Sequence, residues 1–336
     1  MKIWLPYLRA GTGSDVSTYY LAKGLRERGH QVFDQGFSRR YELAPWLLRT
    51  TPQPRGCDVT ITNTWNGFAF ARKGIPMVTV DRLGLFDPTL NPYKSKAQRI
   101  YHNLFVRQFI RRSARAASQV VAVSERTADV FAQQFDVPRP KVILNAVDTD
   151  FFSPPERTRR IEQNQTRRLL YVGTLSRRKG VDLLSSVMRS LGDAYELYYT
   201  GSADAPIFGK DRLPNMHALG RLDQDAMREE YRKAHALLFP SRGEGLARAI
   251  MESLACGTPV AAANISSMPE AVNEQVGRLC PPDDVTSFAA AIKDLTTDDP
   301  TWQQYSRAAR QRAEERFCLN RLLDEFEVLL TGLVEK

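Results

Sequence analysis

Two glutamates beside a break between a strand and a helix are the residues of this chain best suited to chemistry. Glu244 and Glu252 lie eight residues apart in FPSRGEGLARAIMESLACGTPVAA, residues 239–262. Such a turn directs backbone N–H groups, with the positive end of the helix dipole behind them, toward a crevice. If Glu244 lies at the helix mouth and Glu252 two turns in, both can line one wall of that crevice. The stretch predicts a diphosphate site with carboxylates for neighbouring hydroxyls, although two solvated glutamates beside an ordinary turn would also fit.

A second strand-to-helix turn, earlier in the chain, is basic. The stretch VGTLSRRKGVDLL, residues 172–184, places Arg178 and Lys179 just before a helix expected to begin near Gly180. Cations at such a turn can stabilise a diphosphate leaving group without a metal ion. Taken alone, the turn would equally fit a solvated basic loop.

Together these stretches resemble the signatures of the retaining glycosyltransferases of family 4, which have the GT-B fold. The form EGLxRxxxE…GxPVxA carries most of the resemblance, and NAVDTDFFSPPE at 145–156 is similar to the family's inter-domain signature. LAKGLRERGHQV at 21–32 is similar to the first domain of such enzymes. The resemblance implies a metal-independent enzyme, with no cofactor, that takes a sugar from a nucleotide-diphosphate sugar.

The resemblance also implies roles for individual residues. Glu244 would contact the donor sugar or the reacting centre, and Lys179 would contact the diphosphate. Arg178 would supply a charge that the family carries where this chain has Thr174. The implied catalytic residues are therefore Glu244, Lys179 and Arg178. The implied donor-binding residues are Gly11, Gly13, Gly173, Thr174, Ser241, Gly245, Leu246 and Glu252, with Glu252 holding the ribose.

One departure from the family concerns its first domain. Many members have a histidine after the fourth strand of that domain, where this chain has Asp81 or Arg82. His30 lies in the RGH signature at a helix exit and is expected to be structural.

Strands and helices alternate along both halves of the chain, which predicts an α/β protein of two Rossmann-like domains facing a cleft. We expect an acceptor-binding domain over residues 1–155 and a nucleotide-sugar-binding domain over 156–318. By resemblance, the helix in 319–336 would cross back to the first domain. The polar segment 157–168 is expected to be a linker.

Charge is divided unevenly between the halves. Residues 1–155 carry 22 Lys and Arg against 12 Asp and Glu, a net of +10, which leaves −1 for the rest of a chain whose net charge is +9. No carboxylate occurs from Pro88 to Ser124, where a helix is expected at about 94–117. Basic residues of this helix share a side next to aromatic ones: Lys96, Arg99, Arg107, Arg111 and Arg115, with Tyr101, Phe105 and Phe109. The pattern predicts contact with an anionic membrane, although a packed helix with a solvated basic face would also fit.

Other features narrow the function classes. No apolar run approaches the roughly 18 residues that span a bilayer. Four cysteines without a C-x-x-C pair fit a reducing compartment and argue against a zinc site. We therefore expect a cytoplasmic enzyme, peripheral on the inner face of the membrane, whose partners are a nucleotide sugar and a glycan or lipid-linked acceptor.

Three alternatives stay open. The enzyme could make a small soluble sugar metabolite, which would give no reason for a basic, aromatic helix. A nucleic-acid-binding protein would fit the charge but lacks any recognition signature, so no nucleic acid partner is expected. A nicotinamide dehydrogenase would need a more complete glycine fingerprint than the chain has.

Overall fold

The computed structural model describes the whole chain except residues 12, 157–159, 163–164, 206, 209–211 and 336. Its contacts divide the chain into two compact units. Unit 1 comprises Met1–Ala146 and Leu319–Lys336, and unit 2 comprises Val147–Cys318. The sequence had placed the first boundary nine residues later, after residue 155. Part of the expected linker, residues 157–159 and 163–164, lies outside the described residues.

Unit 1 is built on a six-stranded parallel sheet in the order β2-β1-β3-β4-β5-β6. Its strands are β1 (Lys2–Leu8), β2 (Gln31–Phe37), β3 (Val59–Asn63), β4 (Met77–Asp81), β5 (Gln119–Ala122) and β6 (Lys141–Val142). The central strands β3 and β4 are almost wholly buried, because helices cover both faces of the sheet.

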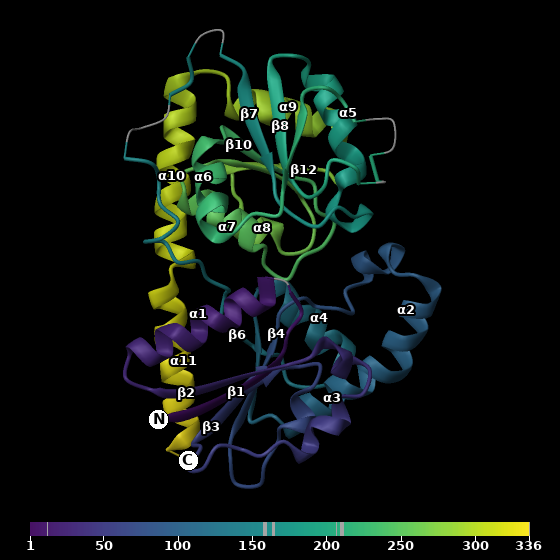
Figure 1. Cartoon of the computed structure of the whole chain (residues 1–336), viewed down its shortest axis with the longest axis vertical. Coiled ribbons are helices and arrows are strands. Elements are labelled where there is room, and N and C mark those ends of the chain that lie inside the picture. Colours follow the sequence, from purple (N-terminus) through teal and green to yellow (C-terminus); the bar gives the residue numbers. More distant parts are fainter. Residues whose placement is uncertain (12, 157–159, 163–164, 206, 209–211, 336) are drawn as a thin grey trace. The chain divides into compact units, whose positions relative to one another are not determined.

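The α-helices of unit 1 lie on both faces of this sheet. They are α1 (Gly13–Glu27), α2 (Lys96–Tyr101), α3 (Arg107–Ala116), α4 (Glu125–Phe135) and α11 (Leu319–Val334). Figure 1 shows α1 and α11 on one face and α3 and α4 on the other. Short 3-10 helices follow β2, β3 and β4, namely η1 (Arg39–Glu42), η2 (Pro45–Thr50), η3 (Gly67–Ala69) and η4 (Pro88–Tyr93), and a π-helix, η5 (His102–Val106), joins α2 to α3.

The helix α11 is attached to α1 by packing and to the turn that follows α1 by ion pairs. Gly24 of α1 leaves room for the side chain of Leu323, which a Cβ at that position would meet. Arg28 donates to Asp324 at 2.6 Å, and the imidazole of His30 lies 2.7 Å from Glu327. His30 is thus bonded as a structural residue would be, as the RGH signature led us to expect.

Unit 2 repeats the architecture with a second parallel sheet, in the order β12-β11-β10-β7-β8-β9. Its strands are β7 (Arg167–Tyr171), β8 (Tyr195–Thr200), β9 (Met216–Gly220), β10 (Ala236–Phe239), β11 (Val260–Ala263) and β12 (Gly277–Cys280). Its helices are η6 (Arg177–Lys179), α5 (Val181–Leu191), α6 (Gln224–Lys233), α7 (Arg248–Ala255), α8 (Met268–Ala271), α9 (Val285–Leu295) and α10 (Asp299–Phe317).

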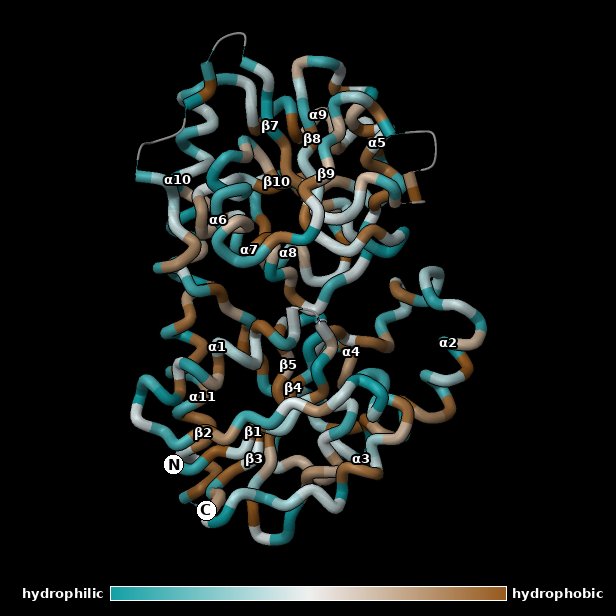
Figure 2. Tube along the Cα trace, viewed as in Figure 1, coloured by the Kyte–Doolittle hydropathy of each residue, from teal (hydrophilic) through white to brown (hydrophobic). Residues whose placement is uncertain are grey.

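The cores of both units follow the strands, whose residues are largely hydrophobic (Figure 2). The two-domain α/β architecture predicted from the sequence is therefore confirmed. Within the described part of the chain, no helix is both long enough and apolar enough to cross a membrane.

Candidate active site

The candidate site of unit 2 lies where the sheet changes direction. β7 and β10 are neighbours in the middle of the sheet, but β7 continues to β8 on one side and β10 to β11 on the other. In parallel sheets, ligands bind outside the carboxyl ends of two such strands. Here those ends lead into two loops, residues 172–180 and 240–247.

Glu244 is the centre of a charged cluster formed by these two loops. Lys179, at the end of η6, forms an ion pair with Glu244 Oε1, and the two side chains are only 16% and 11% exposed. Ser241 Oγ donates to the same carboxylate oxygen at 2.6 Å. The guanidinium of Arg178 lies 3.8 Å from it and donates to the Gly243 carbonyl at 2.6 Å. The structure therefore brings all three predicted catalytic residues together.

The electrostatics of this cluster keep Glu244 ionised. Burial is the largest single influence and by itself would raise the pKa. The charges of Lys179 and Arg178, with hydrogen bonds from Lys179 and Ser241, outweigh burial, so the pKa of Glu244 lies below its ordinary value. The site thus holds a buried carboxylate whose cations can be shared with an incoming anion.

Arg242 ties the two loops together, and sequence reasoning missed it. Its side chain is almost fully buried and donates to Asp182 at 2.7 Å and to Asp283 at 2.6 Å. Its backbone N–H donates to the carbonyl of Arg178 at 2.8 Å. The sequence around Arg242 shows only an arginine between a serine and a glycine. It does not reveal the role of this residue, because the partners of Arg242 lie 60 and 41 residues away in the chain.

A close approach of Gly180 to Pro240 sets the spacing of the loops. Gly180 has φ +72°, and a Cβ there would lie 2.7 Å from the carbonyl carbon and 2.9 Å from the Cβ of Pro240. Only glycine fits both the backbone conformation and the space. Lys179, the preceding residue, is thereby held against Glu244.

Glu252 lies in the second turn of α7 and is separate from this cluster. Its Oε1 pairs with Arg248 at 2.9 Å, and its Oε2 accepts from the Tyr231 hydroxyl at 2.9 Å. Since α7 begins at Arg248, Glu244 belongs to the preceding loop and not to the helix mouth. The helical-wheel relation between the two glutamates therefore does not hold. Tyr231, which sequence reasoning missed, is fully buried, and burial, followed by the charge of Glu252, raises its pKa.

The remaining predicted residues of unit 2 line the same loops. The Gly173 amide donates to Thr200 Oγ1 at 3.0 Å, and exposed Thr174 accepts the Tyr171 hydroxyl at its carbonyl, 3.2 Å away. Buried Gly245 and Leu246 lead into α7, whose N-cap residue, Ala247, makes no side-chain capping bond in the described part of the chain. Such an uncapped terminus can accept an anion.

Gly11 and Gly13 belong to unit 1, after the carboxyl end of β1. The Asp15 carboxylate accepts hydrogen bonds from the amides of Ala10, at 3.1 Å, and Gly11, at 2.8 Å. A diphosphate at Gly11 would have to compete with Asp15, a residue the sequence did not single out. Residue 12 of this glycine loop lies outside the described residues.

The end of β4 carries Asp81 and Arg82, the residues in the place of the family's histidine. Asp81 is buried and accepts the amides of Leu83 and Gly84, each at 3.1 Å. Burial raises its pKa, and these two hydrogen bonds oppose the rise. Arg82 donates to Thr18 at 3.4 Å.

The basic helix of unit 1 is less regular than predicted. The π-helix 102–106 changes the angular order of the residues after it, so a wheel drawn at 100° per residue does not describe the surface. Arg99 and Arg115 are exposed, whereas Arg107 and Arg111 are half-buried. Of the aromatic residues only Phe105 is exposed, at 50%, next to two aliphatic residues that are 60% and 62% exposed, Ile100 and Leu104.

Two further findings concern metals and thiols. The described residues contain no group of three His, Cys, Asp or Glu side chains that could hold a metal ion. All four cysteines are free.

Family models match most of the chain. Residues 33–151 match a model described as Glycosyltransferase Family 4, and residues 166–298 match one described as Glycosyl transferases group 1. The second match contains the loops around Lys179 and Glu244.

Curated relatives are similar over part of their length. Glycogen synthase of Mycobacterium tuberculosis is 33% identical over 159 residues, 44% of this chain and 38% of that protein. The alpha-maltose-1-phosphate synthase of the same organism is 28% identical over 232 residues, 60% of each chain. O-antigen chain mannosyltransferase B of Escherichia coli is 23% identical over 254 residues, 67% of this chain and 64% of that protein. The chain thus spans between about two fifths and two thirds of the length of these relatives.

Solved structures are similar over the whole chain. Sucrose-phosphate synthase from Thermosynechococcus elongatus superposes with a TM-score of 0.82 at 16% identity and covers 99% of both chains. Anabaena HepE, in complex with UDP and glucose, gives a TM-score of 0.78 at 18% identity over 99% of this chain and 100% of its own. At these identities the likeness establishes a shared fold.

Proposed function

Because the chain belongs to the family-4 glycosyltransferases with the GT-B fold, we propose that it transfers a sugar, with retention of configuration, from a nucleotide-diphosphate sugar to a cell-surface glycan or lipid-linked acceptor. The observation that carries the proposal is the cluster of Lys179, Arg178 and Ser241 around the buried carboxylate of Glu244. The complexes of HepE with UDP and glucose support a nucleotide-sugar donor.

In the proposed reaction the diphosphate takes the cations that now surround Glu244. Lys179 and Arg178 would neutralise the negative charge that grows on the leaving phosphate oxygen. The carboxylate of Glu244, released from part of its pairing, would accept hydrogen bonds from donor-sugar hydroxyls. Glu252 would hold the ribose hydroxyls with the lone pairs that Arg248 and Tyr231 leave unused.

The proposed bond changes take place on one face of the sugar. The bond from the anomeric carbon to the diphosphate oxygen breaks, and its electron pair leaves with the diphosphate. The acceptor hydroxyl oxygen bonds to the anomeric carbon from the same side, and its proton passes to the departing phosphate. The side chains supply charge and position, and the reaction as proposed uses no metal ion or cofactor.

We assign a membrane-linked glycan as the acceptor because unit 1 exposes apolar and basic side chains on one helical segment. Exposed Ile100, Leu104 and Phe105 lie in the same helical segment as exposed Arg99. An apolar surface beside basic residues favours peripheral contact with anionic lipid. The similarity to an O-antigen mannosyltransferase supports a role in polysaccharide or lipopolysaccharide synthesis. The similarity to alpha-maltose-1-phosphate synthase supports the second candidate, a transferase that makes a soluble sugar metabolite.

A thermal-shift panel of nucleoside diphosphates and nucleotide sugars tests the donor. A ligand at about 100 times its Kd stabilises a protein by about 2.7 kcal/mol, so the matching nucleotide should raise Tm clearly above its non-matching analogues. Lys179→Ala should remove most of that rise. If no nucleotide raises Tm, or if the variant responds as the wild type does, the assigned donor site is wrong.

A further inference from the structure

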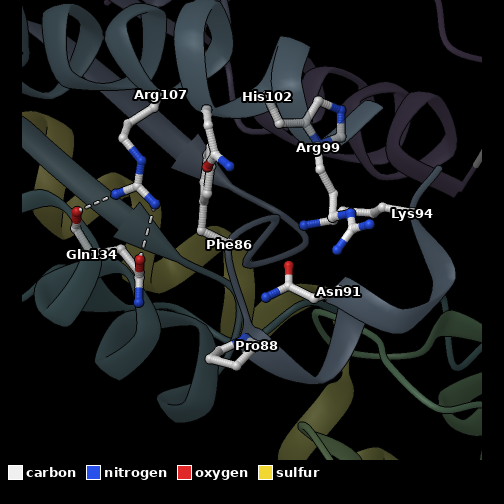
Figure 3. Close-up of a pocket in the computed structure, with 9 residues that line it drawn as sticks. Phe86, Pro88, Asn91, Lys94, Arg99, His102, Arg107 and Gln134 are labelled. Carbon is white, nitrogen blue, oxygen red and sulfur yellow. Dashed lines mark hydrogen bonds between the residues drawn. The ribbon is translucent and has the colours of Figure 1, made fainter. Parts of the chain in front are cut away.

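A pocket of about 310 Å³ lies in unit 1, and none of the residues assigned to the donor is among its lining residues (Figure 3). It follows the carboxyl end of β4, the edge of a parallel sheet at which ligands bind. Its lining residues come from the loop after β4, from η4, from the basic helical segment and from α4: Phe86, Pro88, Asn91, Lys94, Arg99, His102, Asn103, Arg107 and Gln134. Its volume is at the lower end of the range of about 300–1,000 Å³ typical of small-molecule sites.

Among the described residues, three cations and no carboxylate line the pocket. Lys94 is half-buried and donates to the Leu85 carbonyl at 2.6 Å. Burial, followed by the charge of Arg107, lowers the pKa of Lys94 against the opposing influence of Asp87. Figure 3 shows the amine of Lys94, the guanidinium of Arg99 and the amide of Asn91 directed toward the same space.

Arg107 is fixed in place by its neighbours. It donates to the carbonyl of Gln134 at 2.9 Å and to its side-chain oxygen at 3.2 Å, both neutral acceptors. Its guanidinium lies 4.4 Å from the centre of the Phe86 ring. The positive charge of Arg107 is therefore held at the pocket wall without a paired anion among the contacts that the described residues show.

The carboxylate between the lining residues Phe86 and Pro88 already has partners. Asp87, which is 3% exposed, accepts from Arg126 at 2.9 Å and from the amide and hydroxyl of Thr89. His102 adds an unfilled position, because its Nδ1 is buried and has no hydrogen-bond partner in the described part of the chain. Burial, followed by the charge of Lys94, lowers the pKa of His102. The pocket thus combines surplus positive charge with a neighbouring imidazole nitrogen to which none of the described residues is hydrogen-bonded.

We propose that this pocket is a subsite for a phosphate group carried by the acceptor, an inference that rests on the proposed glycosyltransferase function. Three cations, together with the amides of Asn91 and Asn103, outnumber the oxygens of a carboxylate but match the oxygens and charge of a phosphate ester. The volume leaves room for a sugar or glycerol attached to that phosphate. The acceptor of this enzyme is therefore a phosphate ester.

Two kinds of molecule carry such a group. Ile100 and Leu104, exposed on the same helical segment, would contact the hydrocarbon of a lipid phosphate. A soluble sugar phosphate would use the pocket and leave those residues in solvent. The experiment therefore has a soluble arm and a membrane arm.

In the soluble arm, sn-glycerol 3-phosphate and inorganic phosphate are titrated into the whole protein while the C–H signals of its four histidines are followed by NMR. His102→Gln assigns the signal of His102. A phosphate within a few ångströms should raise the pKa of His102, reversing the influence of Lys94. Lys94→Gln with Arg99→Gln should weaken binding at least about tenfold, and Arg99→Gln alone, which breaks no hydrogen bond seen among the described residues, should weaken it in the same direction.

Lys96→Gln with Arg112→Gln is the matched control. It removes the same charge from exposed positions of the same segment that do not line the pocket, and it should change binding less than about twofold. In the membrane arm, binding of the wild type and of each variant to vesicles of phosphatidylcholine alone is compared with binding to vesicles that also contain phosphatidic acid.

Selective loss of binding in the pocket variants supports the proposal. If the loss occurs in the soluble arm, the phosphate group is carried by a soluble ester, and if it occurs in the membrane arm, the phosphate group is carried by a lipid. Equal loss of binding in the pocket and control variants overturns it. An unmoved His102 signal with both phosphate probes, together with equal binding to the two vesicle types, also overturns it. Nucleotide binding is measured on the same samples and should be intact in every variant. If wild type binds phosphate but no nucleotide, the proposed function fails while the phosphate site stands.

Discussion

Replacing Gly180 with alanine tests whether the two loops of the donor site are held in register by direct backbone contact. The new Cβ would lie well inside 3.0 Å of the Pro240 backbone, and neither partner is a flexible side chain. Relieving the overlap requires one loop to move away from the other. Lys179, next to Gly180, would then separate from Glu244.

The loss of unfolding free energy in Gly180→Ala has two parts, a backbone part and a packing part. A control substitution at a second glycine, Gly192, measures the backbone part alone. Gly192, at the other end of α5, has φ +78° and ψ −167°, a backbone conformation that also favours glycine, but a Cβ there would meet no described atom within 4 Å. Gly192→Ala therefore carries only a backbone cost, about 1–3 kcal/mol. Gly180→Ala carries the left-handed backbone cost, about 1–2 kcal/mol, and an overpacking cost of about 1–3 kcal/mol, so its free energy of unfolding should fall by about 2–5 kcal/mol.

The two variants, Gly180→Ala and Gly192→Ala, should differ more in donor turnover than in unfolding free energy. A misplacement of about 1 Å can lower the rate about 100-fold, so Gly180→Ala should lose about two orders of magnitude in kcat/KM for the donor. Gly192→Ala should stay within about twofold of wild type. Urea unfolding gives the stabilities, and nucleotide binding with donor turnover gives the function.

The reasoning about the loops would be refuted by one clear result. If Gly180→Ala matches Gly192→Ala both in unfolding free energy and in donor turnover, the contact with Pro240 does not set the geometry of the site.

Four other predictions concern the same two units. Glu244→Gln and Lys179→Ala should each lower turnover at least about 100-fold with an unchanged circular dichroism spectrum, and near wild-type rates would remove that residue from the mechanism. Activity should survive EDTA; loss with chelation and recovery with Mg²⁺ would show that a metal takes part. Because the pKa of Glu244 lies below its ordinary 4.5, its contribution to stability is full above about pH 4.5 and is lost as the pH falls through the folded-state value. The difference in unfolding free energy between wild type and Glu244→Gln should therefore be constant from about pH 7 to about pH 4.5 and change only below it. Finally, Arg99, Arg111 and Arg115 changed together to Glu should reduce pelleting with anionic vesicles, and the binding should weaken with salt; equal pelleting with neutral vesicles would contradict a membrane surface.

The sequence predicted most of the fold because the signals for it are local. Apolar runs bounded by glycine or proline marked nearly every strand of the two sheets. β12 (Gly277–Cys280) was missed because four residues with a glycine and an arginine give no clear alternation. The 3-10 helices and the π-helix were missed because their patterns are too short to distinguish from loops.

The candidate site was predicted where its residues lie in turns of recognisable pattern. Lys179 and Glu244 were found in this way, and the structure places them in contact. Arg242 and Tyr231 were not found, because their importance comes from partners 60 and 21 residues away. The phosphate pocket was missed for a similar reason. Arg107 was interpreted as part of a surface stripe, and only folding shows it against Phe86 and Gln134.

The return of α11 to unit 1 has a consequence for synthesis on the ribosome. Unit 2 is one continuous segment, Val147–Cys318, so all its strands are available once that segment has emerged. Unit 1 is not complete until Leu323 can pack on Gly24 and Glu327 can reach His30, almost 300 residues later in the chain. The domain translated first is therefore the domain finished last, and the α11-facing side of α1 stays uncovered in the nascent chain while the whole of unit 2 is made.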